Sequence, residues 1–179
     1  MSTFTINIRQ ETPLDHAAVF ELIEQAFANI EYSDHKEHFL VERLRKSEAF
    51  VPELSLVAEV DGAIVGYILV SKLSIKNQTS SVESLALAPV AVLPEFQHKG
   101  IGGQLIRKAH IIAQELGFKS IILLGHAEYY PKFGYQALHT FSITYPFDVP
   151  KENVMAIELE KGSLSNVFGM VEYPKEFLE

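Results

Sequence analysis

Residues 90–113 read VAVLPEFQHKGIGGQLIRKAHIIA, and this stretch decides which fold the chain can form. An apolar run ends in a proline, a short basic turn rich in glycine follows, and an amphipathic helix begins directly after the turn. The first turn of a helix has backbone N–H groups without internal partners and carries the positive end of the helix dipole. Gly100, Gly102 and Gly103 lack a Cβ atom, so an anion can approach those groups closely. The stretch therefore predicts a binding site for an anion such as a pyrophosphate.

The charge around this turn favours the same prediction. Residues 97–114 contain Lys99, Arg107 and Lys108 and no Asp or Glu, whereas the whole chain has a formal charge of −8 at pH 7. An acidic protein binds a polyanion only where positive charge is concentrated. A helix with a glycine-rich start and a solvated basic face would have the same composition, so charge alone does not decide between these two interpretations.

Two familiar phosphate-binding loops are excluded. A P-loop requires GxxxxGK[ST], and no Gly-Lys pair followed by Ser or Thr occurs in the chain. A dinucleotide-binding fingerprint requires a third glycine three positions after Gly102, where Leu105 stands. The turn belongs to a different class of anion site.

Two motifs in the chain match one family of enzymes. Residues 97–102 read QHKGIG, which fits the pattern [QR]-x-x-G-x-[GA] between a strand and a helix, and residues 129–135 read YYPKFGY, an aromatic-Tyr-x-x-x-Gly-aromatic segment. In this order the two motifs resemble the GNAT N-acetyltransferase superfamily. The segments LALAPVAVLP (85–94), GHAEYY (125–130) and GMVEYP (169–174) are similar to one bacterial branch of predicted acetyltransferases.

The resemblance implies an N-acetyltransferase that transfers an acetyl group from acetyl-CoA to a primary amine of a small molecule or protein, by direct attack in a ternary complex. The hydroxyl of Tyr130 would protonate or hydrogen-bond the departing thiolate, since a phenol is a suitable donor to a thiolate. The motifs align the acetyl-CoA-binding positions of the family with the pantetheine-facing residues Val90, Ala91 and Val92 and with the pyrophosphate-binding residues Gln97, His98, Lys99, Gly100, Ile101, Gly102 and Gly103.

The general base is less well defined by the sequence. Several family members use a glutamate in the strand before the glycine turn, but residues 85–93 contain no ionisable side chain. Glu83 is the nearest carboxylate and could act through a chain of water molecules, or it could be a solvated charge at a strand end. His126 and Glu128 are further candidates. Because the strand glutamate is missing, a non-catalytic acyl-CoA-binding sensor module is the alternative function.

Composition sets the class of protein and of partner. With 179 residues, 47% of them apolar, and no cysteine, the chain predicts a single N-acetyltransferase domain over 1–179 without disulfides. No signal peptide or transmembrane run is evident in the sequence, which predicts a cytoplasmic protein without a membrane partner. The charge of −8 favours a cationic acceptor and argues against nucleic acid, and a homodimer is left open.

Histidines invite a metal hypothesis, which the spacing does not favour. His35 and His38 lack the spacing of HExxH and stand in a polar segment, so we expect a solvated face and no metal cofactor. Tyr32 and Phe39 could instead line an acceptor pocket, because the resemblance places this region beside the acceptor groove.

Hydrophobic periodicity predicts an α/β fold with a mixed sheet covered by helices on both faces, which the resemblance refines to the mostly antiparallel sheet of GNAT proteins. Asp61-Gly62 predicts a hairpin turn, Pro89 predicts a bulge or kink in its strand, and Gly117 predicts the end of the helix that follows the glycine turn. The expected helices begin at Pro13 and cover about 33–45 and 101–116, and the expected strands cover 4–8, 54–59, 64–72, 81–93, 120–124, 154–159 and 167–171.

Overall fold

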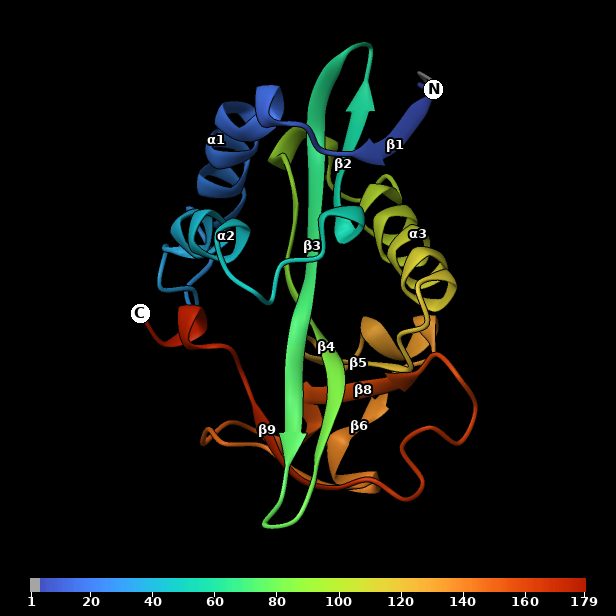
Figure 1. Ribbon diagram of the computed structural model, residues 1–179. Helices are drawn as coiled ribbons and strands as arrows, with labels where there is room; N and C mark the ends of the chain where they lie inside the picture. Colours follow the sequence, from blue (N-terminus) through green and yellow to red (C-terminus); the bar gives the residue numbers. More distant parts are fainter. Residues whose placement is uncertain (1–3) are drawn as a thin grey trace. The chain divides into compact units, whose positions relative to one another are not determined.

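The computed structural model describes residues 4–179, which separate into two compact units. The first unit contains the described chain up to Val70 together with Ala88–Ala109, and the second contains Ser71–Leu87 and His110–Glu179. Two long strands, β3 (Ala63–Lys76) and β4 (Ser81–Val92), contribute residues to both units (Figure 1). Short 3-10 helices lie at Pro13–Asp15, Pro52–Leu54, Pro94–Phe96, Tyr130–Phe133, Leu138–Thr140, Lys151–Asn153 and Lys175–Leu178.

The first unit contains an antiparallel ladder. Strand β1 (Ile6–Gln10) pairs with β2 (Ser55–Val60), and β2 pairs with the first half of β3. The turn between β2 and β3 has positive φ at both central residues, +51° at Asp61 and +79° at Gly62. Positive φ at both positions is typical of the tight hairpin turn that the Asp-Gly pair predicts, so this prediction is confirmed.

Helices cover both faces of the sheet in the first unit, as the sequence predicts. Successive strand residues point to opposite faces, and Gly66 and Tyr67 are neighbours in β3. A Cβ atom on Gly66 would lie 3.0 Å from Ile101, so α3 packs closely on that face. Tyr67 points to the other face, where its hydroxyl bonds Ser55 in a network that ends at Arg45 of α2. The helices are α1 (His16–Phe27), α2 (Glu37–Arg45) and α3 (Ile101–Glu115).

Helix α3 ends in a left-handed glycine cap. Gly117 has φ +90°, its N–H donates to the carbonyl of Gln114 at 3.1 Å, and Phe118 N–H donates to Ala113 at 3.0 Å. This pair of bonds satisfies carbonyls that the helix end leaves without partners. The predicted stop at Gly117 is confirmed.

The second unit is built on a mixed ladder that is mostly antiparallel. Strand β5 (Ser120–Leu124) runs parallel to β4, through Leu85 and Ala86, and antiparallel to β8 (Val154–Glu158). Strand β9 (Phe168–Glu172) pairs antiparallel with β3. The strands predicted in the tail are therefore present. The remaining pairings are β6 (Gln136–Ala137) with β8, antiparallel, and β7 (Ser142–Thr144) with β9, parallel.

The second helix begins later than the sequence predicts. The expected start was Ser33, but α2 begins at Glu37. Ser33 Oγ accepts the N–H of His35 at 2.9 Å, and Asp34 accepts the N–H of Lys36 at 2.9 Å, while His35 has φ +60°. Short polar side chains compete with the helix for backbone donors, and here they form a turn instead.

Candidate functional site

The turn before α3 leaves the backbone amides at the start of the helix without intrahelical partners. Strand β4 ends at Val92, and α3 begins at Ile101. Gln104 N–H donates to the carbonyl of Gly100 at 3.1 Å, so the amides of Ile101, Gly102 and Gly103 precede this first intrahelical bond. Three of the predicted anion-binding amides, those of Ile101, Gly102 and Gly103, thus lie in the first turn of α3.

Gly100 is required by the backbone conformation of this turn. Its φ is +84°, a region that L-residues rarely adopt, and His98 next to Lys99 also has a positive φ of +63°. A Cβ atom on Gly100 would meet no described atom within 4 Å. Position 100 therefore faces open space, and it is the backbone conformation rather than crowding that favours glycine there.

Two side chains support the turn. Gln97 Nε2 donates to the carbonyl of Val92 at 3.1 Å and so ties the turn to the end of β4. The ammonium of Lys99 lies 5.6 Å from the ring centroid of Phe4, whose ring contacts Phe96 edge-on. A cation held over an aromatic face is positioned without being neutralised. Gln97 acts on the backbone of the turn, and Lys99 supplies positive charge beside it.

The predicted pantetheine-facing residues belong to the same unit as the turn. Ala91 is buried, whereas Val90 and Val92 are half-buried. The ladder between β4 and β5 covers Leu85 and Ala86, which precede these three residues in the strand. The structure therefore brings residues 90–92 and 97–103 together as one continuous segment of the first unit.

Tyr130 lies in the second unit and is buried. Its ring contacts that of Tyr135 edge-on, with 5.7 Å between the ring centroids. A Cβ atom on Gly125 would lie only 2.4 Å from the Cε2 atom of Tyr130. Gly125 thus makes the room in which the Tyr130 ring packs. Sequence reasoning did not assign this role, although a glycine directly after a buried strand is a recognisable sign of close approach.

A second tyrosine of the motif forms a hydrogen bond with a helix residue. Tyr135 hydroxyl and His110 Nε2 are 2.8 Å apart, and His110 belongs to the last turns of α3. Burial raises the pKa of Tyr135 well above its usual value, and the electrostatic interaction with Tyr130 acts in the same direction. Tyr135 therefore remains neutral and packs against Tyr130.

The predicted base candidates are solvent-exposed. Glu83 lies near the start of β4, its side chain is 58% exposed, and its carboxylate is 4.0 Å from the ammonium of Lys72. His126 and Glu128 are also exposed. Because these groups are exposed, water can reach each of them, as a base that acts through water requires. The role of Glu83 as the base stays a prediction.

The expectation of a solvated face at His35 and His38 is wrong for His38. This side chain is only 6% exposed, because α2 packs against α1 and its imidazole contacts the rings of Phe20 and Phe39, which also contact each other. His35 is exposed, and its Nδ1 lies 2.9 Å from the carbonyl of Phe27. Within residues 4–179, no group of three His, Asp or Glu side chains could hold a metal ion.

Comparison with known proteins identifies the family. Residues 52–137 match the family model described as an acetyltransferase (GNAT) domain. The uncharacterized N-acetyltransferase YjhQ of Escherichia coli strain K12 is 33% identical over 151 residues, which are 84% of this chain and 80% of the relative. The chain belongs to the GNAT family of acetyltransferases. Both halves of the resemblance, the glycine turn and the aromatic segment, lie within the matched region.

Solved structures of GNAT proteins share the fold. A GNAT family acetyltransferase from Brucella melitensis, solved in complex with acetyl-CoA, is 33% identical with a TM-score of 0.80, and the match covers 97% of this chain and 98% of that chain. YhbS from Escherichia coli, solved with CoA, has a TM-score of 0.86 at 24% identity, over 100% of this chain and 95% of that chain. The predicted α/β class with a mostly antiparallel sheet is confirmed, and so is the assignment to the N-acetyltransferases. Among the described residues, no helix has the length and apolar character needed to cross a membrane.

Proposed function

We propose that this GNAT acetyltransferase binds acetyl-CoA with the pyrophosphate on the backbone amides of residues 98–103. The observation that carries the proposal is the start of α3, where the amides of Ile101, Gly102 and Gly103 precede the first intrahelical bond. The Brucella relative, which matches 97% of this chain, binds acetyl-CoA, and this supports one N-acetyltransferase domain over residues 1–179.

The pantetheine arm would pair with the backbone of Val90, Ala91 and Val92, as an added strand does. The parallel ladder between β4 and β5 pairs Leu85 and Ala86, which precede this stretch. The β4–β5 ladder therefore does not occupy the backbone of residues 90–92, and this supports the assignment. An extended arm held by backbone groups would align the thioester for attack by an amine.

Transfer requires two proton movements. The amine nitrogen attacks the thioester carbonyl carbon, the C–S bond breaks, and the acetyl group stays on nitrogen. Tyr130 would give its hydroxyl proton to the departing CoA thiolate, while the attacking amine would lose a proton to Glu83 through water. A tyrosine that is buried and held by Gly125 and Tyr135 has a fixed orientation, as a proton donor needs.

The acceptor would be a primary amine of a small molecule or of a protein. The formal charge of −8 attracts a cationic acceptor and repels nucleic acid. This steering supports a free amine as the substrate class and leaves the identity of the amine to experiment.

Release of CoA thiol from acetyl-CoA, measured with a panel of amines, polyamines and peptides, tests the proposal. Tyr130→Phe keeps the ring and removes the donor, so we expect acetyl-CoA affinity to stay nearly unchanged and kcat to fall by roughly ten- to ten-thousandfold. Tyr129→Phe is the matched control, because Tyr129 is the neighbouring, half-buried ring of the same motif. Wild-type kcat in Tyr130→Phe beside a strong loss in Tyr129→Phe would move the acid role to Tyr129.

A further inference from the structure

Tyr130 is the first of three aromatic side chains in the second unit that contact one another in series. Its ring meets that of Tyr135 at 78°, with 5.7 Å between the centroids. The third member is His110 on α3, whose imidazole centroid is 5.4 Å from that of Tyr135. The series connects the proposed proton donor to a residue of a long helix.

The Tyr135 hydroxyl fixes the middle of this series. Tyr135 is only 2% exposed, and its hydroxyl oxygen is 2.8 Å from Nε2 of His110. A buried hydroxyl without a partner destabilises a folded protein, whereas a phenylalanine ring fills a similar space without that penalty. The bond to His110 therefore holds the ring of Tyr135, and with it the surface on which the ring of Tyr130 packs.

A second hydrogen-bonded pair holds the other neighbour of Tyr130. The Tyr130 ring occupies the side of Gly125 where any other residue carries its side chain, because a Cβ atom there would lie 2.4 Å from Cε2 of Tyr130. Asn153 binds both backbone groups of Gly125. Its carbonyl accepts the Gly125 N–H at 2.8 Å, and its Nδ2 donates to the Gly125 carbonyl at 3.0 Å. Gly125 cannot move away from the ring without breaking these bonds.

We infer that His110 and Asn153 are positioning residues for the hydroxyl of Tyr130, His110 through Tyr135 and Asn153 through Gly125. This inference rests on the proposed function, in which Tyr130 gives a proton to the CoA thiolate. A proton donor must lie within hydrogen-bond reach of its acceptor, and a misplacement of about 1 Å can cost about a hundredfold in rate. Apolar contact is non-directional, so ring packing alone does not set a position to that precision. The two hydrogen-bonded pairs restrict the ring on two sides.

Steady-state release of CoA thiol, with the best amine of the panel or with water as the acceptor, tests the role of His110. His110→Phe keeps a ring on α3 and removes the partner of the Tyr135 hydroxyl. We expect kcat to fall by about five- to fiftyfold, though not below that of Tyr130→Phe, while the KM for acetyl-CoA stays within about twofold. His110→Gln keeps a hydrogen-bonding group beside Tyr135 and should restore kcat to within about twofold of the wild type.

Two further variants test the same inference without leaving a buried hydroxyl unpaired. Tyr135→Phe removes the hydroxyl together with its need for a partner, and it should lower kcat as His110→Phe does. Asn153→Asp keeps the shape of the side chain but sets a carboxylate against the Gly125 carbonyl, so it should also lower kcat. His139→Phe is the matched control, because His139 is an exposed histidine of the same unit, and its kcat should equal that of the wild type.

The sharpest comparison repeats His110→Phe in the Tyr130→Phe protein. A residue that acts through the Tyr130 hydroxyl has nothing left to position there, so kcat should change by less than about twofold. An equal loss of kcat in both backgrounds would show a merely structural role and overturn the inference. Wild-type kcat in folded His110→Phe or Asn153→Asp, beside a loss in Tyr130→Phe, would overturn the inference alone. Wild-type kcat in Tyr130→Phe would overturn the proposed proton donor and the inference together.

Discussion

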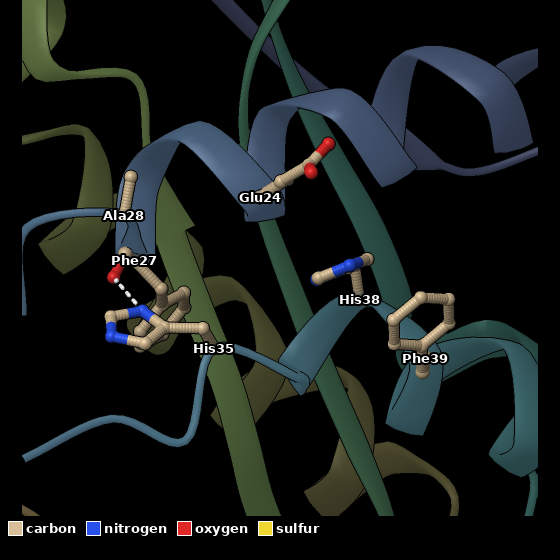
Figure 2. A pocket seen from close by; sticks show the side chains of 6 residues that line it. All are labelled: Glu24, Phe27, Ala28, His35, His38 and Phe39. Carbon is tan, nitrogen blue, oxygen red and sulfur yellow. Dashed lines mark hydrogen bonds between the residues drawn. The ribbon is translucent and has the colours of Figure 1, made fainter.

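The turn at the start of α3 and the hollow between α1 and α2, which Glu24 and His38 line (Figure 2), are built from different parts of the chain. The turn offers backbone amides of consecutive residues, and its specificity depends on the conformation that Gly100 adopts. The hollow is lined by side chains separated by 14 positions, from Glu24 to His38, which come to one place because α1 packs on α2. A site made of backbone amides can therefore be predicted from one short motif. A site made of side chains from two helices depends on how those helices pack.

This difference predicts that substitutions in the two regions affect different properties of the protein. Changes in the glycine turn should remove acetyl-CoA binding and leave the helix pair intact. Changes in the ion pairs that hold α1 and α2 should lower stability and leave the turn intact.

Substitution in the turn should give the largest effect. Gly102→Glu adds a side chain and a negative charge where the pyrophosphate is proposed to lie, and we expect acetyl-CoA affinity to fall about a thousandfold, or ~4 kcal/mol. Gln104→Glu is the matched control, because this exposed position on α3 receives the same charge without obstructing the amides. Calorimetric titration of acetyl-CoA into both folded variants measures the two affinities. An affinity in Gly102→Glu equal to that in Gln104→Glu would show that the amides do not bind the anion.

The next effect concerns the helix that carries His38. Glu11 accepts two hydrogen bonds of 2.9 Å from the guanidinium of Arg45, at the end of α2, and both side chains are at most 10% exposed. Glu11→Gln leaves a buried cation without its carboxylate, so the free energy of unfolding should fall by about 3 kcal/mol. Acetyl-CoA affinity, measured far below the melting temperature, should not change.

Glu172→Gln is the control for this ion pair. Glu172 lies 2.9 Å from the ammonium of Lys76, but its side chain is 60% exposed. Its loss should cost less than about 1 kcal/mol. Equal losses in chemical denaturation of the two variants would contradict the distinction between buried and exposed pairs.

The start of α1 gives a smaller effect that depends on pH. Hydrogen bonds of 2.7 and 2.9 Å from the Arg9 guanidinium hold the pKa of Asp15, the residue before α1, well below its usual value. A carboxyl group with a lowered pKa stabilises the folded state above its unfolded pKa of about 3.9, and this stabilisation disappears as the pH falls through the folded pKa.

Asp15→Asn should therefore lower the free energy of unfolding by about 1 kcal/mol at neutral pH, since Arg9 is partly exposed. The difference from the wild type should shrink steadily below about pH 4. Thermal melts of both proteins over this range measure it. A difference that stayed constant into acid would show that the charge of Asp15 has no part in stability.

Much of the fold could be predicted because its turns need positive φ angles, which glycine adopts easily and most other residues do not. Asp61-Gly62 forms the predicted hairpin turn, and Gly117 ends α3 as expected. The late start of α2 could not be read from periodicity, because Ser33 and Asp34 capture backbone donors and the hydrophobic pattern does not register such bonds.

The candidate sites divide in the same way. Residues 97–103 could be proposed as an anion site because consecutive amides need only a local motif, and they form the loop before α3 and the first residues of that helix. The burial of His38 could not be predicted, since it follows from contact with Phe20 on another helix. Gly125 was missed for a related reason. Its role is visible only once the ring of Tyr130 is placed against it.

Lys99 should give the smallest effect and the finest test of the comparison. Its ammonium is exposed and held over Phe4, so it adds charge near the turn without forming the turn. Lys99→Ala should weaken acetyl-CoA binding by about two- to fivefold at about 0.01 M salt, and the loss should fade at about 0.3 M, because salt screens exposed charges. Lys108→Ala, farther along α3 and also exposed, should have a smaller effect. If Lys99→Ala instead matched Gly102→Glu and resisted salt, the charge of the Lys99 side chain and not the backbone amides would bind the anion, and the turn would depend on side chains as the α1–α2 region does.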